Sequence, residues 1–586
     1  MSPLLVGEEL VPAAQRWYLR RSSSGLQAFL RQVPALDPIL ARVLYARGVA
    51  TATDAHAFLA AEGSLSNPFD MADMAPAVSR LRRAIATREP IVVYGDFDVD
   101  GICATVLLTT ALAMLGAVVS PYIPDRFSES YGVNKAALKR LHSQGARLLI
   151  TVDCGIRSRD EIAYGRSLGL DIIVTDHHSL PPELPEAIAL LNPKRPDCGY
   201  PFKHLSGVGV AYRLVDALFR VAGCMSNSSE GRLGLESFLD LVALGTVADI
   251  VPLIGENRLL AQWGLEHMRR HPRPGLAALL QVSQTAPEEV DSQVIGFRLG
   301  PRINAAGRLK HARLAYSLLT TDSSSEADRL AHELDAVNGE RQRLLEEQVS
   351  RAREIVEESD MHLMLFAAAE SFHEGIVGLI ASRLSEEYYR PALVMRRGKA
   401  ITRGSARSIE GFHITRALDA CSDLLSRYGG HAQAAGYTLV TENLGAFRER
   451  LLAHCEEHIT DEILMPRVDV DAIISLDDLT AKTPQALALL EPCGEGNPPP
   501  MLASRNLILR QARTVGRDGK HLRLALSSES GRTLTGIAFR MGHLAAAYSP
   551  GDRMDLVYTP TLNTWQGQET LELVIHALRP TPTDSL

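Results

Sequence analysis

The chain of 586 residues is long enough for roughly three or four domains, and its 46% hydrophobic and 22% charged residues are typical of a soluble globular protein. No apolar run reaches the ~18 residues of a membrane span, and the N-terminus has no charged start followed by an apolar core, so we expect a cytoplasmic protein. The seven cysteines form no CxxC pair, so we expect neither a disulfide framework nor a zinc ribbon. The net charge of −8 argues mildly against a nucleic-acid partner, although such binding needs only one basic groove.

Two stretches near the N-terminus are predicted to be helical. PALDPILARVLYARGV and TATDAHAFLA place apolar residues at helical spacing behind possible caps, so residues 1–75 are expected to form a helical extension without chemistry of its own. From residue 76 to about 255, apolar strands alternate with amphipathic helices. This alternation predicts an α/β domain with a mostly parallel sheet.

The stretch 91–101, which reads IVVYGDFDVDG, combines a buried strand with three acids. Asp96, Asp98 and Asp100 fall on alternate positions just past the end of the strand. Carboxylates this close together repel one another in a partly buried site, so a cation is expected to hold them. A divalent metal ion is the obvious candidate.

Two later strands end in the same way. ARLLITVD ends in Asp153, and LDIIVTD ends in Asp176, with His177 and His178 directly after it. In an open α/β sheet the carboxyl ends of parallel strands border one crevice, so these side chains are expected at a single site.

A further acid, Asp249, lies in a turn after a helix predicted over 235–245 and is the next candidate ligand. Oxygen ligands with an imidazole suit manganese or magnesium better than zinc. Two such ions bridged by a carboxylate suit phosphodiester hydrolysis.

The middle of the chain is expected to be helical and then α/β again. Residues 256–318 read as helices up to LGPRINAAGR, where Arg302, Asn304 and Arg308 offer donors in a glycine-bounded loop. A long polar helix over 325–358 is typical of a bridge between domains, and residues 360–460 return to α/β alternation.

From about Asp469, short strands separated by Gly, Asp and Asn turns predict a small antiparallel barrel. Phe539, Tyr558 and Trp565 are either stacking residues or, as is commoner in a small barrel, core residues. Two basic clusters also stand out, although a solvated surface is the commoner interpretation of such clusters: Arg396, Arg397, Lys399, Arg403 and Arg407, and then Arg510, Arg513, Arg517, Lys520, His521 and Arg523.

Several motifs together resemble a known family. GDFDVDG, VDCG, TDHH and GTVADIVPL, in this order and spacing, resemble the four motifs of the DHH phosphoesterase superfamily. LGPRINAAGRL, HEGIVGLIASRL, GSARSIEGFHI and GGHAQAAG are similar, within that superfamily, to the RecJ family of bacterial exonucleases, which degrade single-stranded DNA from the 5′ end. The resemblance covers most of the chain from about residue 40 onward.

The resemblance implies both a domain order and a catalytic set. The domains would be an N-terminal extension (1–75), a DHH domain (76–324), a connecting helix (325–358), a DHH-associated α/β domain (359–464) and an OB-fold barrel (465–586). Asp98 and Asp100 would be ligands of separate Mn²⁺ or Mg²⁺ ions, and Asp153 would bridge the two ions. His177 and Asp249 would complete the second site. His178 would touch substrate phosphate, Asp96 would ligate or support its neighbours, and Asp176 would be a supporting residue.

The substrate contacts implied by the resemblance are Arg126, Tyr131, Arg302, Asn304, Arg308, His373, Ser405, Arg407 and His431. Arg126 and Tyr131, in the loop 124–133, would contact the 5′-phosphate and the terminal base, with a surface pair as the alternative. Ser405 and Arg407 would complete the phosphate pocket with Arg126, although from residue type alone a structural salt bridge is the commoner role for Arg407.

The sequence departs from the family pattern at three positions, none of which removes a ligand. Cys154 stands where many relatives have Asn, Ala406 where GSGRS is usual, and Cys493 where Phe precedes the GxGN turn.

Two alternative functions remain open at this stage. A DHH phosphodiesterase acting on cyclic dinucleotides or short oligonucleotides would share the ligands but has no use for a further barrel. A non-catalytic single-strand DNA-binding scaffold would have lost the acids, which are all present. The family resemblance implies a helicase and a single-strand-binding protein as candidate partners. The protein itself is expected to be a monomer.

Overall fold

The computed structural model describes residues 15–20, 24–60, 63–129, 132–223, 234–359, 363–565 and 568–582. Its contacts divide the chain into two compact units. Unit 2 comprises Ala61–His458 with Pro492–Asn497, whereas unit 1 combines both ends of the chain, Met1–Ala60, Ile459–Glu491 and Pro498–Leu586. Within the described residues, no helix is long and apolar enough to cross a membrane.

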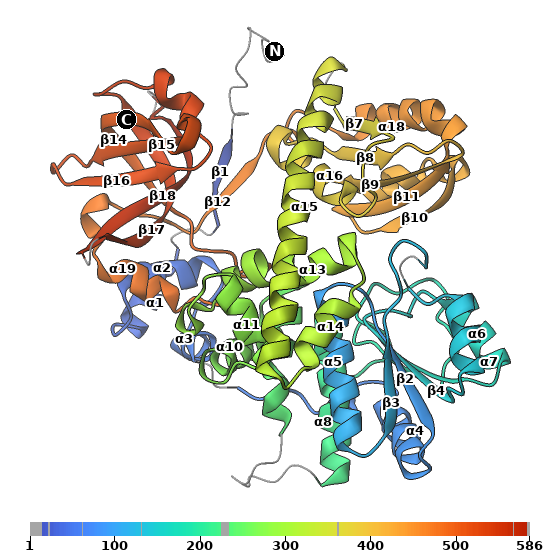
Figure 1. The fold of residues 1–586 in the computed structure, drawn as a ribbon. Coiled ribbons are helices and arrows are strands. Elements are labelled where there is room, and N and C mark those ends of the chain that lie inside the picture. Colours follow the sequence, from blue (N-terminus) through green and yellow to red (C-terminus); the bar gives the residue numbers. More distant parts are fainter. Residues whose placement is uncertain are drawn as a thin grey trace. The chain divides into compact units, whose positions relative to one another are not determined.

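The first part of unit 2 is built on a five-stranded parallel sheet of order β3-β2-β4-β5-β6 (Figure 1). Its elements are α4 (Met74–Ala86), β2 (Pro90–Tyr94), α5 (Val99–Met114), β3 (Val118–Tyr122), α6 (Lys135–Ser143), β4 (Leu148–Val152), α7 (Arg159–Ser167), β5 (Asp171–Thr175), β6 (Ala189–Leu191) and α8 (Gly207–Ala222). The parallel sheet predicted for this region is confirmed.

Both faces of this sheet are buried, which explains why its strands read as continuous apolar runs. Leu148, Ile150 and Val152 of β4 face a core shared with α4, α5 and α8, whereas Leu149 faces a second core with α6 and α7. Helix α5 is apolar on nearly all sides because the sheet, α8 and α9 (Leu239–Ala248) enclose it.

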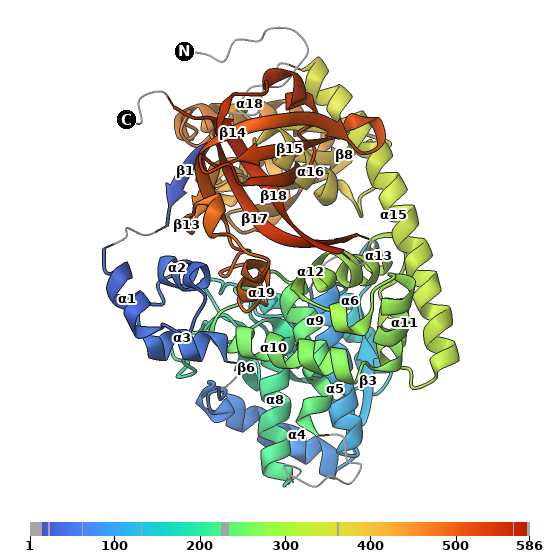
Figure 2. The ribbon, with the colours of Figure 1, turned by 90° about the vertical axis from the view of Figure 1, so that its left-hand side faces the viewer.

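A helical layer follows the sheet and leads into one long helix. Its elements are α9 (Leu239–Ala248), α10 (Gly255–Arg270), α11 (Pro274–Val282), α12 (Ser292–Val294), a π-helical turn η4 (Ile295–Leu299), α13 (Gly300–Leu309), α14 (Arg313–Thr320) and α15 (Ser324–Glu358). The long helix predicted over 325–358 is confirmed. Its first half packs on α11, α13 and α14, and its second half packs on β7 (Leu365–Ala369) and α16 (Val377–Tyr388) (Figures 1 and 2).

The loop predicted around Arg302, Asn304 and Arg308 is wrong, because these residues lie on α13. Pro301 stands in the first turn of that helix, where its missing N–H costs nothing. The glycine at 307 marks close packing and not a turn, since a Cβ there would come within 2.7 Å of the Phe97 carbonyl oxygen.

The second sheet of unit 2 has the order β10-β11-β9-β8-β7, with only the β7–β8 pair parallel. Its elements are β7 (Leu365–Ala369), α16 (Val377–Tyr388), β8 (Ala392–Arg396), β9 (Ile401–Arg407), α17 (Ile414–Asp419), β10 (Leu425–Gly430), β11 (Ala434–Val440) and α18 (Leu444–His458). The second α/β region predicted from the sequence is therefore present.

Unit 1 contains a closed five-stranded barrel, β14-β15-β16-β18-β17, in which β17 pairs back onto β14 (Figure 2). Its elements are β1 (Arg16–Leu19), α1 (Leu26–Gln32), α2 (Pro38–Ala46), α3 (Ala52–Leu59), β12 (Arg467–Val470), β13 (Ala472–Ile473), α19 (Lys482–Ala488), β14 (Leu502–Val515), β15 (His521–Ser527), β16 (Thr533–Ala538), β17 (Arg553–Trp565) and β18 (Gln568–Pro580).

The barrel differs from the sequence prediction in two respects. Three of its strands, β14, β17 and β18, are long and not short, and register shifts bend them where a few strands must close a barrel. The pairing of β16 with β18 is parallel and not antiparallel. Tyr558 is a core residue bonded to Ser504, Phe539 is 52% exposed, and the side chain of Trp565 lies outside the described residues.

Unit 1 also joins the two ends of the chain. Strand β1 pairs in parallel with β12, and Arg47 at the end of α2 forms a salt bridge with the buried Asp471, with 3.0 Å between Nη2 and Oδ2. The N-terminal helices therefore belong to the same unit as the barrel, which local sequence patterns could not reveal.

Candidate metal centre

Three neighbouring strands deliver the acids to one edge of the parallel sheet. Strands β2, β4 and β5 lie side by side and point the same way, so the residues after their last positions meet. Asp153 follows β4 directly, Asp176 follows β5 directly, and Asp96 lies two residues after β2. The structure thus brings these acids together at one edge of the sheet, where the sequence predicts a single site.

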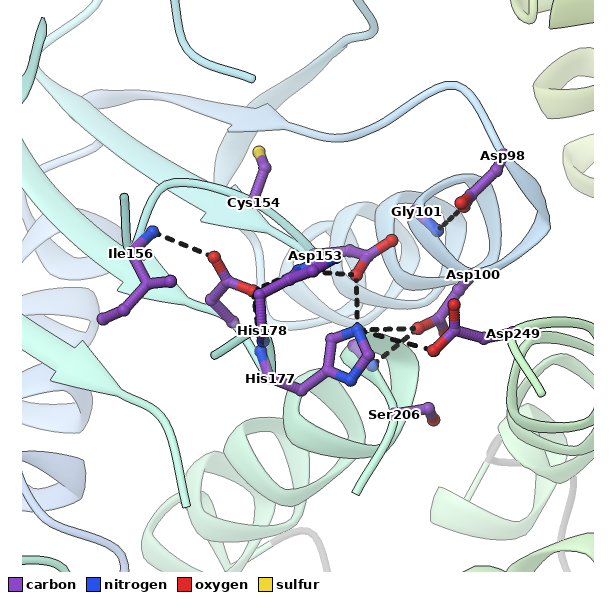
Figure 3. Close-up of polar contacts among 12 residues, drawn as sticks. Asp98, Asp100, Gly101, Asp153, Cys154, Ile156, His177, His178, Ser206 and Asp249 are labelled. Carbon is purple, nitrogen blue, oxygen red and sulfur yellow. Dashed lines mark hydrogen bonds and ion pairs between the residues drawn. The ribbon is translucent and has the colours of Figure 1, made fainter. Parts of the chain in front are cut away.

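The ligand atoms fall into overlapping groups (Figure 3). Asp96, Asp98 and Asp153 form one group, and Asp100, His177 and Asp249 form another, with all ligand atoms of a group within 4.8 Å of one another. Asp153 and His177 also share a third group with His178. Asp153 thus stands between the two carboxylate clusters, the place that a bridging ligand requires.

His177 lies at the centre of this arrangement. Its Nε2 atom is 3.0 Å from Asp153 Oδ1, 3.5 Å from Asp249 Oδ2 and 3.9 Å from Asp100 Oδ2 (Figure 3). Although these atoms are close, Nε2 makes no hydrogen bond among the described residues.

Backbone N–H groups fix two of the acids. Asp98 caps the N-terminus of α5, with Gly101 N–H donating to Oδ1 at 3.0 Å. Asp100 accepts from the N–H groups of Gly207 and Val208, at 2.6 Å and 2.8 Å, in the first turn of α8. The partial positive charge of the helix N-terminus therefore supports the Asp100 carboxylate.

Gly207 also has to be small, because a Cβ atom there would lie 2.6 Å from the Cβ atom of Asp153. Asp153 itself has φ of 59°, a left-handed conformation that non-glycine residues seldom adopt and that often marks a functional site. Gly207 was not predicted from the sequence, although the stretch SGVG, a serine cap before glycine, indicates a closely packed helix start.

Asp176 supports the site instead of facing it. Its carboxylate accepts hydrogen bonds from the N–H groups of Ile156, His177 and His178, and Oδ1 lies 2.8 Å from His178 Nδ1. Burial opposes its ionisation, but the bonds from His178 outweigh burial and lower the pKa of Asp176 to about 2. The same bond raises the pKa of His178 against the effect of its burial.

The electrostatics show how unfavourable this cluster is without a cation. Burial, reinforced by the charge of Asp98, raises the pKa of Asp100 to about 7 and raises the pKa of Asp96 as well. Burial and the neighbouring acids also raise the pKa values of Asp153 and Asp249. Burial and the nearby His178 lower the pKa of His177 to about 3, so that its imidazole is neutral and available as a ligand.

The residues fit divalent cations. Asp96 Oδ1 and Asp153 Oδ1 are buried and have no hydrogen-bond partner among the described residues, although a buried carboxylate oxygen normally has one. Carboxylate oxygens with one neutral imidazole are the donor set that Mn²⁺ and Mg²⁺ accept.

An arginine cluster flanks the acids. Arg126 stacks over the Phe97 ring, with its Cζ atom 4.6 Å from the ring centroid. Burial lowers the pKa of Arg126, and the negative charges of Asp96 and Asp98 partly oppose this effect. Burial, together with repulsion from Arg126, Arg341 and Arg407, lowers the pKa of Arg308 to about 9. None of these four arginines has a carboxylate partner within ion-pair distance among the residues that the structure describes. Arg341, on α15, was not identified from the sequence because its helix is charged on most faces.

Arg407 makes neutral contacts only, which removes the salt-bridge alternative for the described residues. Its Nε donates to Ser382 Oγ at 3.1 Å, and its Nη1 donates to Ser405 Oγ and to the Ala406 carbonyl oxygen, both at 2.9 Å. Burial and the nearby Arg126 lower its pKa.

The two predicted histidines of the second sheet domain have different surroundings. Burial lowers the pKa of His431, and the positive charges of Arg407 and His178 lower it further. His373 packs edge-on against Phe127, with ring centroids 5.7 Å apart, beside a cavity of about 540 Å³. Tyr131 lies outside the described residues.

Two predicted substrate residues are engaged elsewhere. Arg302 pairs with Asp335 of α15 at 2.9 Å. Asn304 Oδ1 accepts the Val99 N–H at 3.2 Å and so ties α13 to the first turn of α5, where Asp98 and Asp100 stand. Arg302 nevertheless lies near the arginine cluster, because its charge adds to burial in lowering the pKa of Arg341.

Three family models match the chain in sequence order. They are the DHH family, N-terminal domain, over residues 90–246, the DHHA1 domain over residues 362–457, and the RecJ OB domain over residues 470–577.

Curated relatives and solved structures agree with these matches. The chain is 37% identical to the single-stranded-DNA-specific exonuclease RecJ of Bacillus subtilis, covering 97% of this chain and 71% of the relative. It is 34% identical to the protein of the same name from Escherichia coli, covering 93% and 96%. The crystal structure of RecJ in complex with Mn²⁺ from Thermus thermophilus superposes with a TM-score of 0.82 at 29% identity, covering 97% of this chain and 80% of that one.

Proposed function

The chain belongs to the RecJ family of single-stranded-DNA-specific exonucleases, and on that premise we propose that it hydrolyses the 5′-terminal phosphodiester of single-stranded DNA and releases 5′-mononucleotides. Family membership makes it a nuclease that works with Mn²⁺ or Mg²⁺ in DNA recombination and repair. The observation that carries the proposed reaction is the position of Asp153 between two carboxylate clusters, beside arginines that have no carboxylate partner among the described residues.

Asp96, Asp98 and Asp153 would hold one ion, and Asp100, His177 and Asp249 would hold the other. Asp153, which is also grouped with His177, would be the bridging ligand. When bound, the two ions supply activation of a water molecule and neutralisation of charge on the attacked phosphate. The raised pKa of His178 favours its protonated imidazole, which is suited to donate an N–H to a phosphate oxygen.

The arginine cluster gives the reaction its direction. Arg407 is held through Nε and Nη1 by Ser382, Ser405 and the Ala406 carbonyl oxygen, and its Nη2 group is left to donate to a terminal phosphate. Arg126 and Arg308 add charge from the first domain and from α13. A chain end with a free 5′-phosphate satisfies more donors here than an internal phosphodiester does. His373, His431, Arg302, Asn304 and Tyr131 stay proposed substrate residues, with Asn304 acting through α5.

The proposed domain division is an N-terminal extension (1–75), a DHH domain (76–324), a connecting helix (325–358), a DHH-associated domain (359–464) and an OB-fold domain (465–586). We propose that the protein acts as a monomer in the cytoplasm, where chromosomal DNA is, after a helicase has opened the duplex. A single-strand-binding protein is the second proposed partner, because it covers the strand that the enzyme degrades.

Digestion of single strands labelled at the 5′ or the 3′ end tests the proposal. With Mn²⁺ or Mg²⁺, the 5′ label should leave at once as a mononucleotide, while the 3′ label stays on a shortening strand. EDTA should stop both reactions. Early release of the 3′ label would reject the direction, and activity confined to dinucleotides in a length series would favour a phosphodiesterase of short oligonucleotides.

A further inference from the structure

The segment after Asp249 is strained. Asp249 is the C-cap of α9, with its N–H donating to the Gly245 carbonyl oxygen at 2.9 Å. Ile250 follows with φ of 58°, a conformation that a β-branched side chain rarely adopts, and it is 70% exposed. A strained residue of this kind persists only when its surroundings hold it. Because the side chain of Ile250 is mostly in solvent, the backbone holds this conformation. On one side the Ile250 N–H donates to the Val247 carbonyl oxygen at 3.3 Å, and on the other the residues after Ile250 are fixed by other parts of the chain.

The residues that hold it come from a distant part of the chain. Pro492–Asn497, here named the latch loop, packs with unit 2, although the chain on either side of it belongs to unit 1. Leu253 donates its N–H to the Glu495 carbonyl oxygen at 2.7 Å. Ser292 Oγ donates to the Cys493 carbonyl oxygen at 2.6 Å, and Arg258 Nη1 donates to the Pro492 carbonyl oxygen at 3.2 Å.

The latch loop is itself a rigid turn. Gly494 and Asn497 exchange both backbone hydrogen bonds, at 2.8 Å and 3.2 Å, and Asn497 Nδ2 donates to the Pro492 carbonyl oxygen at 2.9 Å. Asn497 is 2% exposed. A Cβ atom at Gly494 would come within 2.8 Å of Leu253 Cδ1, so the turn lies directly against the segment 250–254.

The opposite side of that segment is held by α10. Asn257 Nδ2 donates to the Pro252 carbonyl oxygen at 3.1 Å and to the His204 carbonyl oxygen at 2.6 Å. The segment is thus fixed between α10 and the latch loop, next in the chain to Asp249, whose carboxylate points toward His177 (Figure 3).

We propose that the latch loop is a positioning element for the metal ligand Asp249. It fixes Leu253, which keeps Ile250 in its left-handed conformation and Asp249 Oδ2 at 3.5 Å from His177 Nε2. This inference rests on the proposed role of Asp249 as a ligand. The latch loop is continuous with the C-terminal chain, so a movement of that chain that displaces the loop would weaken binding of the ion held by Asp249, Asp100 and His177. Binding of that ion would in turn stabilise the latch loop.

The test measures metal binding by the full-length protein without DNA. Gly494→Val places branched carbons against Leu253, and Gly234→Val is the matched control, because Gly234 has extended backbone and no atom within 4 Å of an added Cβ. Free Mn²⁺ is followed by electron paramagnetic resonance during titration. The wild type and Gly234→Val should bind two ions, whereas Gly494→Val should keep one and bind the other about tenfold more weakly.

A kinetic readout separates positioning from general destabilisation. On a short oligonucleotide, Gly494→Val should need about tenfold more Mn²⁺ for half-maximal activity and recover near-wild-type kcat at saturating Mn²⁺. Ser292→Ala, which removes the hydroxyl bonded to the Cys493 carbonyl oxygen, should shift the same constant in the same direction by a smaller factor and serves if Gly494→Val does not fold.

Asp249→Ala distinguishes the two ways of failing. If Asp249→Ala still binds two ions with wild-type affinity, the ligand assignment is wrong. If Asp249→Ala loses an ion while Gly494→Val and Ser292→Ala both bind Mn²⁺ as the wild type does, the latch loop does not position Asp249 and the inference is overturned.

Discussion

Asp96, Asp100, Asp153 and Asp249 are carboxyl groups held close together around a neutral histidine, and each has its pKa raised, chiefly by burial. Such a set destabilises the metal-free fold, because the unfolded chain ionises these groups freely in water. Single substitutions should therefore reveal the repulsion among these carboxyl groups and the role of the arginines that have no carboxylate partner among the described residues.

Replacing the proposed bridging acid should abolish catalysis without harming the fold. We expect Asp153→Asn to lower kcat by at least about a thousandfold, since it removes a ligand from both ions. In EDTA its melting temperature should equal or exceed that of the wild type, because one buried negative charge is gone. Asp160→Asn, at an exposed acid on α7, is the control and should change neither quantity. Metal-dependent activity retained by Asp153→Asn would contradict the assignment.

The stability of the metal-free protein should fall as the pH rises from 6.5 to 8. Asp100, with a pKa raised to about 7 by burial and by Asp98, keeps its proton in the folded state where the unfolded chain, with a pKa of ~3.9, has lost it. The folded state therefore binds more protons in this window and loses stability as they leave. His177, whose pKa is lowered to about 3 by burial and by His178, works in the opposite direction only below ~6.5.

Thermal melts in EDTA check this pH dependence. Asp100→Asn should flatten the fall, and Mn²⁺ should raise the melting temperature more at pH 8 than at pH 6.5. A metal-free melting temperature that rises over this range would show that the carboxyl groups are ionised throughout it.

Arg407 should read the 5′ end through its Nη2 group while Nε and Nη1 hold the guanidinium in place. Arg407→Lys keeps the charge, but a single ammonium cannot bridge Ser382 and Ser405 and at the same time donate to the phosphate in the same way. Turnover should fall by about tenfold or more on 5′-phosphorylated strands and less on strands with a 5′-hydroxyl. Arg390→Lys, on the same domain and bonded to the Tyr389 carbonyl oxygen, is the control. An equal loss on both substrates would assign Arg407 a structural role.

At the scale of elements, the centre depends on where helices begin. Helices α5 and α8 both start at the site. The start of α5 presents Asp98 and Asp100, and the first turn of α8 donates two N–H groups to Asp100. The acids after the strands were predictable because the ends of parallel strands always meet. The approach of Gly207 to Asp100 was not, because it joins residues 107 positions apart, and the local stretch SGVG indicates a closely packed helix start without indicating its partner. The loop predicted around Arg302 failed because its glycines serve helix packing.

Adding one methyl group at the start of α8 should therefore disrupt the centre. Gly207→Ala forces the helix away from Asp153, so we expect activity to fall by about a hundredfold and Mn²⁺ affinity to fall with it. Gly209→Ala, two residues further along and facing Ser206 and Leu205, should retain most activity. Mn²⁺ titration and single-strand digestion compare the two variants. Equal activities would show that α8 can shift without cost.

At the scale of the whole molecule, the barrel should contribute affinity rather than chemistry. Lys520, Arg540 and His543 line a cavity of about 560 Å³ in the barrel, and Arg517 lies on the same turn as Lys520. Replacing Arg517, Lys520 and Arg540 together by Gln should weaken binding to long single strands and lower the salt slope by ~0.7 for each phosphate that is no longer neutralised.

Hydrolysis of short oligonucleotides should survive that triple substitution. Arg523→Gln is the control, because Arg523 is paired with Glu572 at 2.7 Å and is not available to DNA in the same way. Fluorescence anisotropy at several salt concentrations measures the slope. An unchanged slope would show that the three side chains are solvated surface.

The pairing of β1 with β12 has a consequence for biosynthesis. Arg16 meets Arg467, so the first strand leaves the ribosome about 450 residues before its partner exists. At roughly 5–20 residues per second, that interval lasts roughly 20–90 s. During it, the edge of β1 and the apolar faces of α1 to α3 have no native surface to cover them, and unit 2 can complete its cores first. The nascent chain therefore finishes folding at its two ends simultaneously, and a chaperone that shields its beginning has the whole of translation in which to act.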